Sequence, residues 1–128
     1  MKNNPLVAPV LKWVGGKRQL LKDIGKYIPS QYSTYYEPFL GGGAVLFALQ
    51  PNKAVVNDIN EELINVYTVI RDHLEELIED LKQHKNEADY YYEIRELDRD
   101  KKKYHQLSNV EKASRIIYLN KTCYNGLF

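Results

Sequence analysis

Residues 34–58, TYYEPFLGGGAVLFALQPNKAVVND, place a turn of three glycines between two short strand-forming segments. The two tyrosines favour a strand over residues 33–37, and the apolar run Ala54–Val56 indicates a second, buried strand. Residues 39–43 are expected to form a tight loop, followed by a short apolar helix over 44–49. The sequence therefore predicts the order strand, glycine loop, helix, strand, which is typical of an α/β domain.

Outside this stretch the pattern is helical. Apolar spacing predicts helices over residues 17–27, 60–81, 90–97 and 109–120, with Asn109 as the cap of the last one and Lys101–Lys103 in a polar link before it. We therefore expect a partial Rossmann-like domain over 1–59, and a helical insertion over 60–128. Only two strands are convincing, so the domain is expected to be incomplete.

The glycine loop and a distant acid suggest a nucleoside-containing ligand. Glycines let a backbone approach a ligand closely, and the following helix offers free N–H groups at its start. Asp58 lies 17 residues beyond Gly41, at the end of the second strand, where a carboxylate can bind ribose hydroxyls. A purely structural turn is the alternative for the loop taken by itself.

The segment Lys12-Trp13-Val14-Gly15-Gly16-Lys17 invites comparison with a phosphate-binding P-loop. That motif is rejected because Arg18 and Leu11 stand where it requires a hydroxyl residue and a glycine. Trp13 and Lys17 still indicate ligand contact through an aromatic face and a cation. A core tryptophan beside a helix start explains the segment equally well.

Composition is that of an ordinary globular protein, with 44% hydrophobic and 27% charged residues and a net charge of +1. Basic residues exceed acidic ones over 1–26 and 101–128, whereas acids dominate 57–100. Basic ends suit a polyanion such as DNA, although solvated faces explain them too. The single Cys123 and three dispersed histidines give no support to a metal site. No membrane span or secretory signal is evident, so a cytoplasmic location is expected.

Four motifs together resemble the Dam-type DNA adenine-N6 methyltransferases, in the group whose cofactor motif precedes the catalytic one. The resemblance covers essentially the whole chain. It rests on Lys12–Lys17, Tyr36–Gly43, Asn57–Asn60 with Glu62–Asn65, and the final Tyr124–Phe128.

The resemblance implies a role for each matching position. S-adenosylmethionine would be held by Trp13, Lys17, the loop residues Phe39, Gly41 and Gly43, and Asp58 through its ribose. Double-stranded DNA would be approached by Lys12, Tyr124, Asn125 and Leu127, with Tyr124 stacking where a base is displaced. Residues 124–126 are also explained as a helix end with glycine in a left-handed cap.

The family's catalytic Asp-Pro-Pro-Tyr is missing, because no two of the five prolines are adjacent. The chain is therefore expected to be an inactive N-terminal part of an enzyme that methylates adenine in a GATC-like site. Self-association through the unfinished domain surface is expected. One alternative is a non-catalytic nucleoside- or DNA-binding module, or a subunit of a split enzyme. An NAD-binding half-domain is another, although Leu46 replaces the third glycine of its motif.

Overall fold

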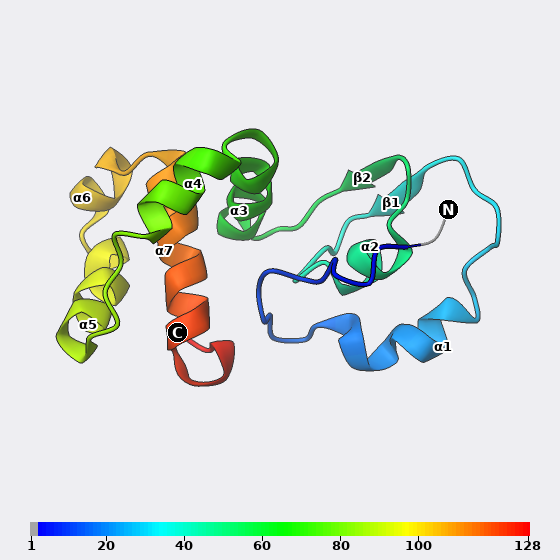
Figure 1. The fold of residues 1–128 in the computed structure, drawn as a ribbon, viewed down its shortest axis with the longest axis horizontal. Coiled ribbons are helices and arrows are strands. Elements are labelled where there is room, and N and C mark those ends of the chain that lie inside the picture. Colours follow the sequence, from blue (N-terminus) through cyan, green and yellow to red (C-terminus); the bar gives the residue numbers. More distant parts are fainter. Residues whose placement is uncertain (1–2) are drawn as a thin grey trace. The chain divides into compact units, whose positions relative to one another are not determined.

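A computed structural model describes residues 3–128, which form two compact units, one ending at Ile59 and the other beginning at Asn60 (Figure 1). The first unit contains a 3₁₀ turn, two short helices and two strands: η1 (Lys17–Leu20), α1 (Leu21–Gly25), β1 (Tyr35–Glu37), α2 (Ala44–Leu49) and β2 (Ala54–Val56). The second is entirely helical: α3 (Glu61–Asp72), α4 (Leu74–Leu81), α5 (Ala88–Glu96), η2 (Leu97–Arg99), α6 (Lys101–Gln106), α7 (Asn109–Thr122) and η3 (Tyr124–Gly126).

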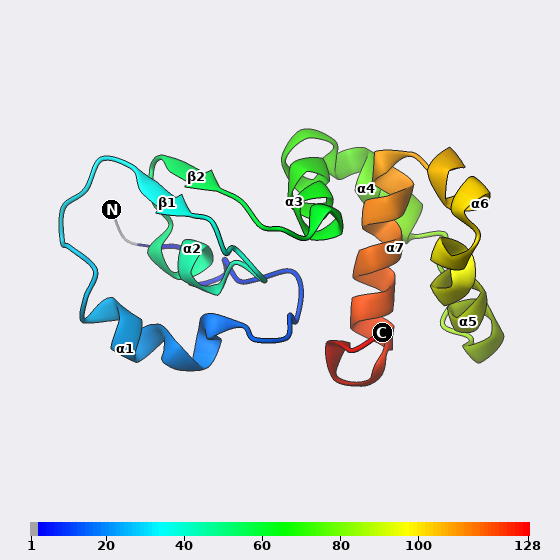
Figure 2. The ribbon, with the colours of Figure 1, turned by 180° about the vertical axis from the view of Figure 1, so that it is seen from behind.

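The two strands of the first unit pair in parallel, with Tyr36 opposite Val55 and Glu37 opposite Val56. A parallel pair needs a crossover connection, and α2 supplies it beside the strands (Figure 2). Gly43 caps α2 with φ +80°, and Gln50 ends it with φ +47°, so the short helix lies between two left-handed residues. Because the strands run in the same direction, their carboxyl ends meet at one edge of the pair.

One face of the strand pair is open to solvent. Tyr36 is 70% exposed and its register partner Val55 is 51% exposed. The expectation of a buried strand at Ala54–Val56 was therefore wrong about burial, although the strand has the expected bounds. Tyr36 and Val55 are thus exposed on this face of the first unit, whereas the strands of a complete parallel sheet are covered on both faces.

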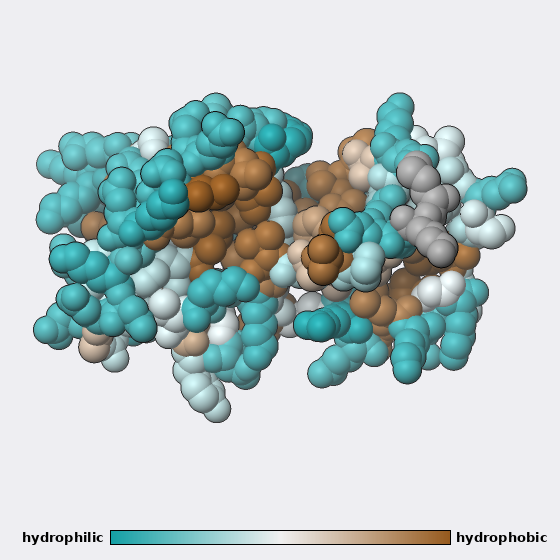
Figure 3. Space-filling view, in the orientation of Figure 1, coloured by the Kyte–Doolittle hydropathy of each residue, from teal (hydrophilic) through white to brown (hydrophobic). Residues whose placement is uncertain are grey.

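The second unit is built around α7, where every residue from Ala113 to Asn120 is buried. A helix buried on all sides is central to its unit, and α7 packs against α3, α4 and α5. Hydrophobic side chains also reach the surface of the molecule (Figure 3), among them the half-exposed Leu74 and Ile78 of α4. No helix within residues 3–128 is long and apolar enough to span a membrane.

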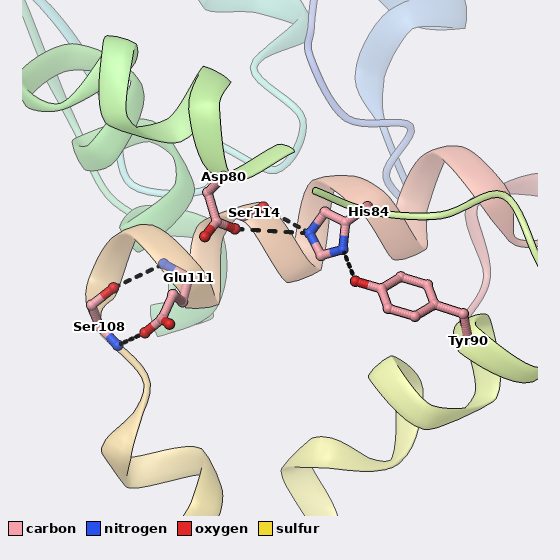
Figure 4. A network of polar contacts seen from close by, with 6 residues as sticks. All are labelled: Asp80, His84, Tyr90, Ser108, Glu111 and Ser114. Carbon is pink, nitrogen blue, oxygen red and sulfur yellow. Dashed lines mark hydrogen bonds and ion pairs between the residues drawn. The ribbon is translucent and has the colours of Figure 1, made fainter. Parts of the chain in front are cut away.

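A polar network joins three elements to α7 (Figure 4). The His84 ring makes 2.8 Å hydrogen bonds with the Tyr90 hydroxyl at Nδ1 and with the Ser114 hydroxyl at Nε2, and Asp80 lies 3.9 Å from Nε2. The same ring stacks on Tyr118, with centroids 4.5 Å apart. Burial lowers the pKa of His84, and the Asp80 carboxylate opposes that shift only in part. The network therefore holds a neutral histidine in the helical unit.

Several helix boundaries differ from the sequence-based expectations. The helix expected over 60–81 is interrupted at His73, whose φ of −138° is not helical. Ser108, not Asn109, caps α7, because its hydroxyl and the Glu111 side chain form a reciprocal capping box. Lys101–Lys103 belong to α6 and not to a link, because the Asp100 side chain caps that helix. The first helical segment ends at Gly25, two residues earlier than expected.

Candidate cofactor site

The loop between β1 and α2 lies across the carboxyl ends of both strands. The Asn57 N–H donates to the Glu37 carbonyl at 2.8 Å, and the Leu40 N–H donates to the Asn57 carbonyl at 3.0 Å. The loop then turns through Gly41 and Gly43, whose φ values of +55° and +80° favour glycine. In parallel α/β sheets, ligands bind outside the carboxyl ends of the strands. The loop therefore occupies a position suited to a binding site.

The structure joins Asp58 to this loop. One oxygen of its carboxylate accepts a hydrogen bond from the Gly41 N–H at 2.9 Å, and the residue is half-buried. The spacing of 17 residues in the sequence thus becomes direct contact in space. Asp58 and the glycine loop therefore lie together at the carboxyl ends of the strands.

Trp13 packs against the same loop. A Cβ atom added to Gly41 would lie 3.9 Å from Trp13 Cδ1, and one added to Gly42 would lie 3.1 Å from the Leu11 carbonyl oxygen and 3.4 Å from Trp13 Cβ. The N-terminal segment and the loop therefore approach so closely that a side chain at position 42 would require the Leu11 carbonyl to shift. The sequence motif indicated Gly41 and Gly43 but not this packing role of Gly42, since sequence spacing does not reveal a close approach.

Lys17 is engaged within the protein. Its ammonium group donates to the Phe39 carbonyl at 2.5 Å and lies 3.2 Å from Glu37 Oε1. Glu37, only 8% exposed, also accepts a 2.5 Å hydrogen bond from the Tyr35 hydroxyl through Oε2. Burial, together with this bond to a carboxylate, raises the pKa of Tyr35 above its usual range, so the phenol keeps its proton and donates. Lys17 therefore ties η1 to the end of β1.

Glu37 is not among the site residues that the sequence motifs indicate. Its signal in the sequence is an acid at the end of a strand, directly before the glycine loop. In the structure a buried carboxylate there holds both Lys17 and Tyr35. By contrast, the Phe39 side chain is 74% exposed and is available to a ligand on the outer side of the loop.

These residues have the chemistry that S-adenosylmethionine requires. The Asp58 carboxylate suits ribose hydroxyls, and the exposed Phe39 ring suits the flat face of an adenine. The glycine loop leaves main-chain atoms without side chains in front of them. No group of three or more His, Cys, Asp or Glu residues within residues 3–128 is arranged to hold a metal ion.

The predicted DNA-contacting residues lie in both units. Lys12 is exposed in the first unit, and in the second Tyr124 and Leu127 are 88% and 54% exposed. α7 ends at Thr122 with an extended Cys123, and Asn125 and Gly126 then adopt positive φ, at +55° and +75°, within η3. The left-handed glycine therefore belongs to the turn after the helix and does not cap α7. An open groove beside it is lined by Tyr91, Tyr92, Tyr118, Tyr124 and Leu127, among others.

Comparison with known proteins gives a consistent result. Residues 13–128 match the model of the D12 class N6 adenine-specific DNA methyltransferases. The Type II methyltransferase M1.LlaDCHI of Lactococcus lactis subsp. cremoris is 46% identical over 99% of the chain. The Type II methyltransferase M.MjaIII of Methanocaldococcus jannaschii is 39% identical over 95%, and a DNA adenine methylase of Haemophilus influenzae is 33% identical over 93%. The chain spans 45%, 48% and 42% of these relatives, respectively.

Proposed function

The chain belongs to the D12 class N6 adenine-specific DNA methyltransferases, and we propose that it forms the S-adenosylmethionine-binding front of such an enzyme together with the start of its DNA target-recognition region. The complete enzyme transfers a methyl group from this cofactor to adenine N6 in duplex DNA, at a GATC-like site. The cofactor's sulfonium makes the methyl group reactive. The chain contains no Asp-Pro-Pro-Tyr, so we expect no methyl transfer from these 128 residues.

The observation that carries this proposal is the contact between Asp58 and the glycine loop. The Gly41 N–H and the Asp58 carboxylate meet at the carboxyl ends of two parallel strands, beside Trp13. In the proposed complex Asp58 accepts hydrogen bonds from the ribose hydroxyls. Trp13 and Phe39 contact the apolar parts of the cofactor, and the main chain at Gly41 and Gly43 lies against it.

Lys17 has a positioning role in this proposal. Its ammonium group already lies between the Glu37 carboxylate and the Phe39 carbonyl, so it fixes the loop that faces the cofactor. A bound cofactor carboxylate can share this cation, because the Lys17 side chain remains 34% exposed. Glu37 keeps Lys17 in place and is expected to act through it.

The proposed domain is Rossmann-like and incomplete within these residues. A parallel β–α–β unit with a glycine loop at its first turn supports that fold. The exposed pair Tyr36 and Val55 supports a further covering layer in the complete enzyme. The same exposed face favours a second candidate function, in which the chain is one subunit of a split enzyme.

On the DNA side we propose that Lys12, Tyr124, Asn125 and Leu127 contact the duplex. The Tyr124 ring is 88% exposed and can therefore stack on a base. Such contacts belong to the recognition step and require no chemistry from the chain.

The experiment that tests the cofactor assignment is isothermal titration of the 128-residue chain with S-adenosylmethionine and, separately, with NAD. The proposal predicts binding of S-adenosylmethionine and a much weaker response to NAD. Equal or stronger binding of NAD would favour the NAD-binding half-domain. If neither compound binds, the proposed cofactor site is rejected. A methylation assay on GATC-containing DNA should show no transfer by this chain.

A further inference from the structure

Helix α6 begins with three consecutive lysines, Lys101, Lys102 and Lys103, and all three are exposed. Cations at the start of a helix face the positive end of its dipole and are locally unfavourable. The helix forms because Asp100 accepts a hydrogen bond from the Lys103 N–H at 3.2 Å. The lysine cluster, Lys101–Lys103, therefore does not stabilise the helix in which it lies.

The lysine cluster also has no acidic partner in the part of the chain described. Neighbouring cations do: Arg99 pairs with Glu96 at 2.8 Å, and Arg115 pairs with Asp98 at 3.3 Å. Within residues 3–128 no ion pair involves the ammonium groups of Lys101, Lys102 or Lys103. Three like charges therefore follow one another along the first turn of α6 without an acidic partner.

The helix beneath the cluster is anchored to the helical unit. The Tyr104 hydroxyl donates a hydrogen bond to Glu62 of α3, and the Lys112 ammonium of α7 lies 4.9 Å from the centroid of the Tyr104 ring. Leu107 follows α6 and is half-buried. These contacts fix the position of α6, so the three lysines form a defined surface feature and not a loose tail.

The surplus positive charge of residues 101–128 is concentrated in this cluster. Arg115 is 5% exposed and binds main-chain carbonyls of α5, and Lys112 lies over Tyr104. The exposed lysine side chains that remain in this segment are the lysine cluster and Lys121. The strongly acidic α4, with Glu75, Glu76 and Glu79, belongs to the same unit, so its surface charge is unevenly divided.

We propose that the lysine cluster contacts the phosphodiester backbone of duplex DNA. This inference rests on the proposed function, which makes DNA the substrate, and adds a contact outside residues 124–127. Phosphates accept hydrogen bonds from ammonium groups and compensate their repulsion. Contacts of this kind orient a protein on the duplex without specifying sequence.

The test is duplex-DNA binding by the full chain, measured by fluorescence anisotropy between about 50 and 200 mM salt. The variant Lys101→Gln/Lys102→Gln/Lys103→Gln removes three charges from the cluster. The matched control Arg71→Gln/Lys82→Gln/Lys85→Gln removes three exposed charges of the same helical unit, two of them from ion pairs with Asp72 and Glu79. Each duplex is used in a GATC-containing and a scrambled form.

The inference predicts that the cluster variant binds both duplexes more weakly and that its plot of log affinity against log salt loses up to about three units of slope, roughly one per lysine. The control should keep the slope of the unchanged chain. The thermal midpoint of the cluster variant should stay the same or rise, because the helix dipole no longer faces three cations. A slope unchanged in the cluster variant, or lost equally in the control, overturns the inference and leaves the proposed function intact. Failure of the unchanged chain to bind DNA also overturns it, and the cofactor titration, which needs no DNA, still decides the proposed function.

Discussion

The two units differ in what holds them together. The helical unit has a hydrophobic core of its own, with buried side chains from α3, α4 and α7: Leu63, Val66, Val69, Leu77, Ala113, Ile116, Ile117, Tyr118 and Leu119. In the unit that ends at Ile59, the buried apolar side chains are Leu11, Leu40, Ala44 and Val45. The unit with the smaller core carries the glycine loop, Asp58 and Trp13.

The two units are therefore stabilised in different ways. A core of interdigitated helices gains stability from apolar burial, at about 25 cal/mol per Å². The unit that ends at Ile59, called the cofactor unit because it carries the proposed site, relies instead on polar contacts, such as Lys17 with Glu37 and Gly41 with Asp58, and leaves Tyr36 and Val55 exposed. Substitutions should therefore affect folding most in the helical unit and ligand binding most in the cofactor unit.

The largest effect is expected from Leu119→Ala. Leu119 is fully buried in α7, so its truncation should lower the free energy of unfolding of the helical unit by about 2–5 kcal/mol. Leu74→Ala is the matched control, because Leu74 is 49% exposed and should cost far less. Urea unfolding followed by circular dichroism measures both. Equal losses in the two variants would contradict a core centred on α7.

In the cofactor unit, Asp58→Ala should weaken S-adenosylmethionine binding by about 1–3 kcal/mol, the range for lost hydrogen bonds to a charged group. Calorimetric titration measures the change. The control Asp23→Ala removes an exposed carboxylate whose partner is Lys26 and should leave affinity unchanged. Unchanged affinity of the Asp58 variant would remove this residue from the pocket.

Gly42→Ala tests the close approach of the N-terminal segment to the loop. The new methyl group would meet the Leu11 carbonyl at 3.1 Å, and accommodating it should cost about 1–3 kcal/mol in stability or cofactor binding. Gly25→Ala is the matched control, because no atom lies within 4 Å of a Cβ at that position. If both variants behave like the unchanged chain, Trp13 and the loop are not packed as described.

The helical unit should lose stability in acid through His84. Because the folded state lowers the pKa of His84, the unfolded chain binds a proton first, so stability is complete above the ordinary value of 6.5 and falls as the pH drops below it. His84→Gln should flatten this dependence in urea titrations. His73→Gln, at an exposed histidine beside Glu76, should preserve it. A pH dependence that survives the loss of His84 would refute the role of the network.

The smallest effect on folding is expected at the open face of the strand pair. Tyr36→Ser/Val55→Thr should change the free energy of unfolding by no more than about 0.5 kcal/mol per site, because both side chains are largely exposed. The same variant should reduce self-association, measured by sedimentation velocity. If the variant self-associates as strongly as the unchanged chain, another surface mediates the association.

In the cofactor unit, the local sequence pattern predicted the bounds of the elements better than it predicted their contacts. The bounds of α2 and β2 agree with the expectations, because Gly43 and the Pro51 turn mark them in the sequence. The exposure of Val55 could not be predicted from the apolar run Ala54–Val56. The burial of a strand depends on the elements packed over it, and the strand's own sequence does not specify these. The engagement of Lys17 with Glu37 depends on the folded path of η1, and sequence spacing does not provide it.

In the helical unit the errors concern helix ends. Ser108 and Glu111 have the spacing of a capping box, but the neighbouring Asn109 is also a favoured cap residue and was chosen instead. The three consecutive lysines predict a polar link, but Asp100 directly before them caps a helix. The His84 network joins residues up to 30 positions apart, so periodicity within one helix cannot indicate it.

The central proposal is that S-adenosylmethionine binds at the carboxyl ends of the two strands, against the glycine loop and Asp58. The most direct measurement is an NMR titration of the ¹⁵N-labelled chain with this cofactor, following the amides of Gly41 and Gly43 and the indole N–H of Trp13. The account predicts that these signals shift most, and that the amides of Lys101–Lys103 in the helical unit do not move. Shifts confined to the helical unit, or no shifts at saturating cofactor, would contradict it.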